Sequence, residues 1–193
     1  MKSAIKSARN SKVDRQAELY MQKQLKTANK LCRRFVNIYN THELEEFHTF
    51  VEENFIDNFV CYDTSGTKIH PLTGTPNVEI QTDGIDNFKE YAALHFDCVP
   101  DGCLVVDKVR VMQKGKKISM KATSMGTVVK DCITPGAIDC RISALLSTDA
   151  NTRFRTDHEV EKAVRNATFN RKCCFQFSLD GHNKIRRMDI SSI

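Results

Sequence analysis

Residues 83–127 read DGIDNFKEYAALHFDCVPDGCLVVDKVRVMQKGKKISMKATSMGT, and this stretch decides the fold. Its apolar residues change from a helical spacing to the alternating spacing of strands, and the chain turns twice. In the first part five residues share one helical face: Ile85, Phe88, Ala92, His95 and Phe96. Asp83 precedes them and is suited to cap the helix through its carboxylate. The pattern predicts a helix that buries one face on a sheet.

Two strands are predicted after this helix. Residues 100–102, Pro-Asp-Gly, end the helix, because proline cannot continue it and Asp-Gly is typical of turns. Gly115 stands between two lysines and predicts a hairpin turn. Alternation then places the following residues on one face of the first strand: Val105, Val109 and Val111. Residues 118–122 alternate in the same way and form the returning strand.

The rest of the chain adds two helices before this stretch and a hairpin after it. A helix is expected from about Val13 to Asn40, where Gly and Pro are absent, and a second helix begins at Thr41. Residues 58–63 predict a strand, and residues 64–83 an irregular loop. Residues 137–156 fit either a strand or a helix, and another helix is expected near Thr156. Residues 173–179 and 185–190 predict the closing hairpin.

Length and composition limit the class of protein. At 193 residues the chain suits one domain with an appendage, and no apolar run predicts a membrane span or a secretory signal. We therefore expect no membrane partner and a cytoplasmic or nuclear location. The eight cysteines are interpreted as buried thiols, although Cys98 and Cys103 flank the 100–102 turn and are candidates to approach each other.

The positive charge is concentrated at the N-terminus. The net charge is +5, whereas residues 1–34 hold ten Lys and Arg against Asp14 and Glu18. We expect residues 1–27 to be a basic, partly helical extension, and residues 28–193 to be the domain, with an insertion at about 131–170. Four residues of the extension are candidates to contact an anionic partner such as nucleic acid: Lys12, Arg15, Lys23 and Lys26. A solvated helical extension is the preferred alternative, because no recognised motif or cluster of stacking aromatics accompanies the charge.

Five short motifs resemble, in order, those of nuclear transport factor two-like proteins, SnoaL-type polyketide cyclases and ketosteroid isomerases. They are residues 35–44 (FVNIYNTHEL), 84–88 (GIDNF), 99–101 (VPD), 126–127 (GT) and 180–185 (DGHNKI). The resemblance covers about residues 28–130 and 170–193. It implies an α+β fold in which a curved antiparallel sheet of about four to six strands wraps around three helices as a cone. This fold implies a blind conical pocket between sheet and helices.

The resemblance also suggests where catalytic groups would lie. Asp63 falls where ketosteroid isomerases have the carboxylate that moves a proton next to a carbonyl. Their oxyanion-binding tyrosine corresponds to Phe35, which cannot donate a hydrogen bond, and their acid falls near Cys173. SnoaL-type cyclases commonly have a histidine where this chain has Val128. The usual partners of the base are therefore missing at the matched positions.

Several residues have both a structural and a functional interpretation. Asp63 fits a turn-capping aspartate or a general base, and His95 fits a core histidine or a polar group in the cavity. Asp63 and His95 are the catalytic candidates. The expected ligand-lining residues are Phe35, Tyr39, Phe59, Phe88, Tyr91, His95, Phe175 and Phe177. No pair of histidines has the spacing of metal ligands, so we expect neither a metal nor a cofactor.

Three functions follow from these observations. The preferred one is a non-catalytic module that binds a small apolar or amphipathic molecule or another protein, as a homodimer formed through the outer face of its sheet. The alternative is a cofactor-independent lyase, isomerase or hydrolase in which Asp63 is the base and His95 or Tyr91 polarises the substrate. The third is nucleic-acid association through residues 1–34.

Overall fold

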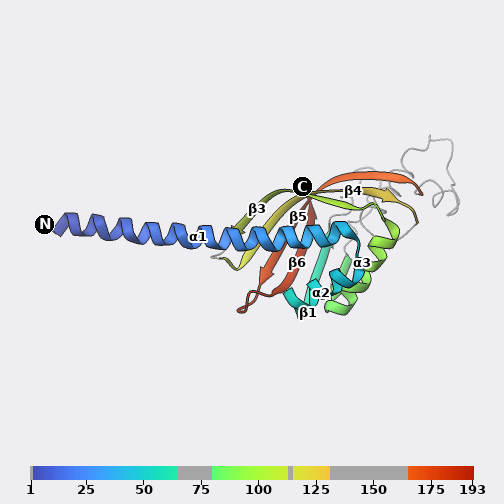
Figure 1. Ribbon diagram of the computed structural model, residues 1–193, viewed down its shortest axis with the longest axis horizontal. Helices are drawn as coiled ribbons and strands as arrows, with labels where there is room; N and C mark the ends of the chain where they lie inside the picture. Colours follow the sequence, from blue (N-terminus) through green and yellow to red (C-terminus); the bar gives the residue numbers. More distant parts are fainter. Residues whose placement is uncertain (1, 65–79, 113–114, 131–164) are drawn as a thin grey trace, which may run out of the picture.

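The computed structural model describes residues 2–64, 80–112, 115–130 and 165–193, with side chains from residue 15 onward. Its elements, in chain order, are α1 (Lys2–Thr41), α2 (Leu44–Asn54), β1 (Phe55–Thr64), β2 (Ile80–Asp83), α3 (Ile85–Cys98), β3 (Cys103–Met112), β4 (Lys117–Val128), β5 (Ala167–Leu179) and β6 (Ile185–Ser192). The three helices and the sheet confirm the expected α+β class (Figure 1). The expectations for residues 137–156 and Thr156 lie outside the described residues.

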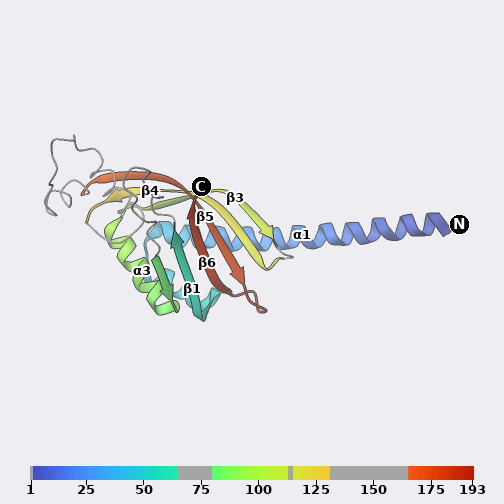
Figure 2. The same cartoon turned by 180° about the vertical axis from the view of Figure 1, so that it is seen from behind.

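Helix α1 begins at Lys2, earlier than the Val13 start expected from the sequence. Its N-terminal half extends beyond the rest of the molecule, and its C-terminal half lies beside the sheet (Figures 1 and 2). In that second half one side of the helix is buried, at Ala28, Cys32, Phe35 and Val36. The absence of Gly and Pro lets the helix continue in both directions from this packed segment.

The sheet has six strands in the order β2-β1-β6-β5-β4-β3. Neighbouring strands are antiparallel except for β1 and β6, which run parallel, so the sheet is mixed and not purely antiparallel as expected. The reason is the chain path: β3 to β6 form a meander that starts at the far edge and brings its last strand alongside β1. The sheet is open, with β2 and β3 at its edges, and it does not curl around the helices.

Strand β2 was not predicted from the sequence, which favoured a loop across residues 64–83. It pairs with β1 in the antiparallel direction, with Thr82 opposite Cys61. Asp83 belongs to this strand, so the helix cap expected there is wrong. The residue before α3 is Gly84, with φ of 86° and no side-chain cap, and its N–H donates to the Phe59 carbonyl at 2.7 Å. A positive φ favours glycine at this junction.

A bulge in β3 changes which of its residues face the core. The register with β4 shifts between Val106 and Lys108, which adds one residue to β3. Leu104 is therefore buried and Val105 is 47% exposed, whereas Val109 and Val111 pack against the core. The prediction that Val105 shares their face is wrong, because one extra residue exchanges the two faces of a strand.

Two of the short motifs contact each other directly. Asp101 accepts hydrogen bonds from the backbone N–H and the hydroxyl of Thr127, both at 2.6 Å. These bonds lower the pKa of the Asp101 carboxyl. Beside them, Gly126 lies against Val99 and Gly102, so that the turn after α3 is held against the end of β4.

Asn40 and His42 make the corresponding connection from the end of α1. The Asn40 side chain donates to the Leu104 carbonyl at 3.0 Å and accepts from the Leu104 N–H at 2.8 Å. His42 Nε2 hydrogen-bonds the Gly102 carbonyl at 2.7 Å, and its ring stacks on Phe96. These bonds satisfy backbone groups of the edge strand β3 and fix the end of α1 over it.

The expectation that every cysteine is a thiol is wrong for one of the described cysteines. Cys98 is disulfide-bonded, whereas Cys103 is a free thiol, so the two residues beside the 100–102 turn are not joined. Cys32, Cys61, Cys173 and Cys174 are free as well. Burial raises the pKa of the Cys32 thiol to about 12, which keeps it protonated and unreactive. Among the described helices none is both long and apolar enough to cross a membrane.

We expect Gly126→Ala to lower the free energy of unfolding by about 1–3 kcal/mol, because the added Cβ would overlap Val99 Cγ1 and lie 3.2 Å from the Gly102 Cα. Urea unfolding followed by circular dichroism measures the loss. Gly181→Ala is the matched control, because a Cβ at Gly181 meets no atom within 4 Å and should change stability by less than about 0.5 kcal/mol. Equal losses in the two variants would contradict the close contact.

Candidate functional site

A small cavity of about 50 Å³ lies between the helices and one face of the sheet. All three helices and the strands β1, β3, β4, β5 and β6 contribute to its lining. Of the residues predicted from the sequence, it is lined by Phe35, Tyr39, Asp63, Phe88, Tyr91, His95 and Phe175. Phe59 and Phe177 are buried elsewhere in the core and do not line it. The structure thus brings both catalytic candidates to the same cavity.

Asp63 is carried into the cavity by the alternation of β1. Phe59, Cys61 and Asp63 occupy every second position and are all buried, so the carboxylate points to the side of the apolar residues. Asp63 is 4% exposed, and its Oδ2 accepts a hydrogen bond of 3.1 Å from the Tyr91 hydroxyl. A buried carboxylate requires such partners, because desolvation of a charge is costly.

His95 reaches the cavity from α3 and is 7% exposed. Its Nε2 shares a hydrogen bond with the hydroxyl of Tyr39 from α1. Burial lowers the pKa of His95 to about 3, and the positive charge of Arg171 and the nearby His42 act in the same direction. The imidazole is therefore neutral at physiological pH and exchanges hydrogen bonds without carrying charge.

The two tyrosines are protonated donors. Burial raises the pKa of Tyr39 and that of Tyr91, and the charge of Asp63 adds to the effect at both. The cavity therefore contains a carboxylate acceptor and two phenolic hydroxyls within an aromatic lining. A small molecule with one polar group fits this distribution of donors and acceptors.

Arg171 is the functional candidate that the sequence analysis missed. It is partly buried, lines the cavity from β5, and lies 5.8 Å from the Phe169 ring centroid. A signal was present in the sequence, since Arg171 stands in an alternating series with Phe169, Cys173 and Phe175, all of which face inward. Ser124 on β4, which is 5% exposed, is a second polar lining residue that was not predicted.

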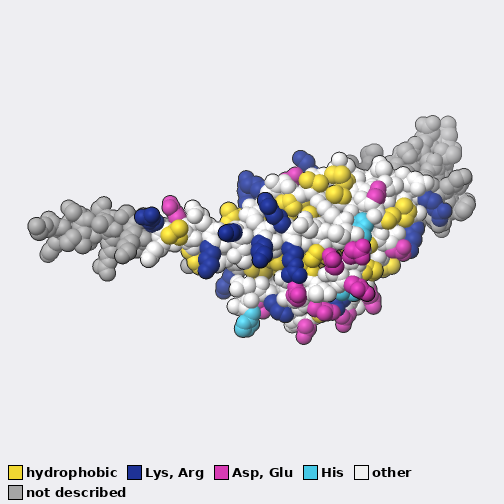
Figure 3. Space-filling model, viewed as in Figure 1, with side chains coloured by type: hydrophobic (Ala, Val, Ile, Leu, Met, Phe, Trp, Pro, Cys, Tyr) yellow, Lys and Arg dark blue, Asp and Glu magenta, His cyan; other side chains and the backbone are white. Residues whose placement is uncertain are grey.

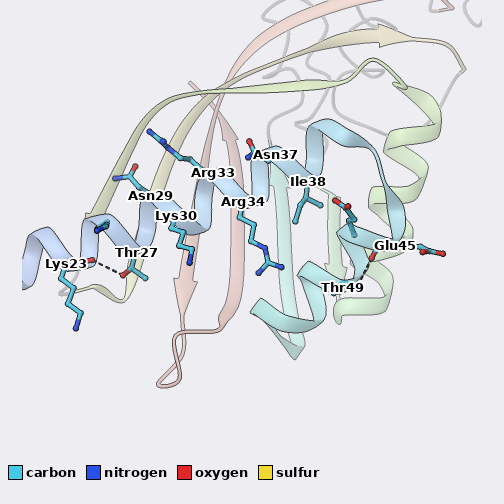
Figure 4. A pocket seen from close by; sticks show the side chains of 12 residues that line it. Lys23, Thr27, Asn29, Lys30, Arg33, Arg34, Asn37, Ile38, Glu45 and Thr49 are labelled. Carbon is cyan, nitrogen blue, oxygen red and sulfur yellow. Dashed lines mark hydrogen bonds between the residues drawn. The ribbon is translucent and has the colours of Figure 1, made fainter.

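The predicted nucleic-acid residues lie away from the cavity. Lys23 and Lys26 line a surface groove of about 1380 Å³ along α1, and Arg15 is exposed nearer the N-terminus of α1. The side chain of Lys12 lies outside the described residues. Figure 3 shows Lys and Arg side chains gathered over α1, with Asp and Glu gathered over the neighbouring region of α2 and α3. In Figure 4, Lys23, Lys30 and Arg34 extend to the same side of α1.

No group of three or more His, Cys, Asp and Glu side chains within the described ranges is arranged to hold a metal ion. The cavity brings together Asp63, the two tyrosines, neutral His95 and the Arg171 cation. This set can bind a polar group or move a proton.

Comparison with known proteins identifies the fold. No family model matches the sequence, and no curated protein matches it. A SnoaL-like polyketide cyclase from Jannaschia sp. CCS1 superposes with a TM-score of 0.51 at 11% identity, covering 84% of each chain. The epoxide hydrolase/cyclase-like enzyme SalBIII, which acts in pyran ring formation in the polyether salinomycin, gives 0.52 at 11% identity, covering 87% of this chain and 92% of its own.

A third solved structure comes from Mycobacterium tuberculosis and was determined in complex with estradiol-17beta-hemisuccinate. It superposes with a TM-score of 0.50 at 9% identity, covering 84% of this chain and 91% of its own. At these identities the comparison concerns architecture and not activity. The chain therefore has the fold of the SnoaL-like and nuclear transport factor two-like proteins.

Proposed function

We propose that this protein binds a small, mainly apolar molecule with one hydrogen-bonding group in the cavity between its helices and its sheet. The observation that carries the proposal is the convergence of Asp63, His95 and Arg171, from three different elements, on one cavity that is otherwise aromatic. A purely structural core has little reason to collect polar and ionisable groups, since burying them is costly. Pockets for small molecules commonly combine an apolar lining with a few convergent polar groups.

The size of the cavity determines how a ligand would enter. A volume of about 50 Å³ is close to that of one or two water molecules. Pockets for organic ligands hold roughly 300–1,000 Å³. Binding therefore requires side chains to move apart, and Phe35 is an obstacle because it lines the cavity and packs on four other aromatic rings.

The polar residues restrict the chemistry of the ligand. Asp63 accepts hydrogen bonds, so a hydroxyl on the ligand can donate to it beside Tyr91. Arg171 carries a positive charge, opposite in sign to Asp63, and therefore favours an electron-rich oxygen on the ligand. The complex of the M. tuberculosis protein shows that this fold accommodates an apolar molecule with oxygen substituents, which supports the proposal by analogy of fold alone.

We expect 1-naphthol, which has an apolar ring system and one hydroxyl, to bind saturably, and naphthalene to bind at least about tenfold more weakly. The physical reason is that a ligand without the hydroxyl leaves the buried polar groups unpaired. Titration followed by the fluorescence of the probe measures both affinities. Phe35→Leu should tighten 1-naphthol binding, because it removes ring atoms from the lining of the cavity.

Asp63→Asn is the variant that tests the polar contact, and it should weaken 1-naphthol binding by about tenfold through loss of a charged acceptor. Asp107→Asn is its matched control, because Asp107 is exposed on β3 and outside the cavity lining. The proposal is contradicted if neither the wild type nor Phe35→Leu binds the probe, or if the two Asn variants behave alike.

The neutral state of His95 predicts how stability depends on pH. The folded pKa of about 3 lies below the usual value of 6.5, so the unfolded chain binds the proton first as the pH falls. The contribution of His95 to the free energy of unfolding is fully present above about pH 6.5 and decreases as the pH falls towards 3. Over this range the equilibrium constant of unfolding rises by up to roughly tenfold per pH unit. His95→Gln should flatten the profile between pH 6.5 and 4.5, measured by urea unfolding. His182→Gln, in an exposed turn, should leave it unchanged.

An acid-base enzyme is the second candidate, and the inward orientation of Asp63 favours it. A buried carboxylate next to the Tyr91 hydroxyl is placed to remove a proton from a bound ketone while a hydroxyl holds the developing oxyanion.

Cyclohex-3-enone is a small test substrate, because its isomerisation to the conjugated enone is followed by absorbance. Catalysis by the wild type that falls by about a hundredfold or more in Asp63→Asn would establish the enzyme. Absence of turnover by the wild type would exclude this reaction.

A further inference from the structure

The outward side of α1 bears a dense row of positive charge that the cavity does not use. We define the basic groove by its five cations, Lys23, Lys26, Lys30, Arg33 and Arg34, all of which are exposed. Lys23, Lys26, Lys30 and Arg33 are spaced by three, four and three residues, which places them along one helical face, and Arg34 lies about 100° around the helix from Arg33. From Lys23 to Arg34 the rise of the helix is roughly 16 Å. Arg15 continues the same face toward the N-terminus, about three turns before Lys26.

This row of cations destabilises the helix that carries it. Lys26 and Lys30, and Lys30 and Arg34, are like-charged pairs at i, i+4, each of which costs about 0.2–0.5 kcal/mol. Within the described part of the chain, Arg34 is the member of the groove with an ion pair, to Glu53 at 2.7 Å. An anionic partner would relieve this repulsion, which the fold itself does not require.

The other lining residues fit a phosphate backbone. Asn29 and Asn37 place amide groups among the cations, and such groups supply many of the contacts to phosphate oxygens in complexes with DNA. One N–H of Asn29 donates to the Leu25 carbonyl and leaves the second N–H for a ligand, whereas the Thr27 hydroxyl donates to the Lys23 carbonyl. At the far end of the groove Glu45 and Glu46 would repel an anion and limit the contact to α1 (Figure 4). The site therefore suits a linear polyanion lying along the helix.

From this complementarity of charge and shape, we propose that the basic groove binds the phosphate backbone of double-stranded nucleic acid without sequence preference. A duplex presents one strand phosphate about every 3.4 Å along its axis, so roughly five lie within the length of the groove. No aromatic side chain is among the lining residues of the groove, so unpaired bases find no stacking surface there. Ile38 is its one apolar lining residue, which gives little to insert into a lipid bilayer.

The test is titration of the full-length protein into a fluorescein-labelled 20-base-pair DNA duplex, followed by anisotropy between 25 and 200 mM KCl. We expect the logarithm of the association constant to fall with the logarithm of salt concentration with a slope of about −2.7 to −4.5, for three to five phosphate contacts. The triple variant Lys26→Gln/Lys30→Gln/Arg33→Gln should bind more weakly and with a slope smaller by about 2.7. Glutamine preserves helix propensity, so circular dichroism should show unchanged helix content.

The matched control removes three exposed charges that do not line the groove, as Lys108→Gln/Arg110→Gln/Lys121→Gln on β3 and β4. It changes the net charge equally and should retain affinity within about twofold. The proposal is overturned by undetectable duplex binding at 25 mM KCl or by equal losses in the two triple variants. It is also overturned if single-stranded DNA binds more than tenfold tighter than the duplex, or if phosphatidylserine vesicles bind and the duplex does not.

Discussion

The packing of Phe35 against the sheet is the contact on which both the fold and the cavity depend. Its ring lies 5.8–6.2 Å from those of Tyr39, Phe50, Phe175 and Phe177, which joins α1 to α2 and to β5. Burial of aromatic area on this scale holds the second half of α1 on the sheet. The same ring lines the cavity between helices and sheet, which has a volume of about 50 Å³. Stability and access to the site are therefore opposed at one residue.

Asp63 and His95 are tolerated in the cavity because each has a partner of suitable chemistry. Tyr91 donates to Asp63, Tyr39 pairs with His95, and burial keeps the imidazole neutral, so the desolvated charge is kept small. A ligand with one polar group can replace such an intramolecular bond at little cost, whereas an apolar ligand cannot. Selectivity for ligand polarity thus follows from the same network that makes the site compatible with folding.

The sequence was sufficient where structure follows from local chemistry. The period of α3, the turns at residues 100–102 and 180–184, and the alternation in β5 were predictable, and Asp63 and His95 were recognised as candidates. Three features were not predictable from local pattern. The bulge near Asp107 is an extra residue in β3 that depends on pairing with β4. Strand β2 forms only because β1 offers an edge to pair with. The parallel pair of β1 and β6 joins parts of the chain that are distant in sequence. Arg171 was overlooked because a charged residue in an apolar strand is ordinarily placed outward.

Helix α1 carries two independent surfaces, and this separation explains how one helix can serve two purposes. Ala28, Cys32 and Phe35 bind it to the sheet, while Lys23, Lys30 and Arg33 face away from the core. Repulsion among the cations costs tenths of a kcal/mol per pair, whereas burial of a large side chain contributes about 1.5–3 kcal/mol. The inward contacts therefore hold the charged face in place without any anion being present. Toward the N-terminus Leu19 and Tyr20 are more than half exposed, so that packing is lost there and the helix depends on its own propensity. A polyanion bound to the basic groove would therefore act on the same part of α1 that packs on the sheet, and would leave the N-terminal part to its own propensity.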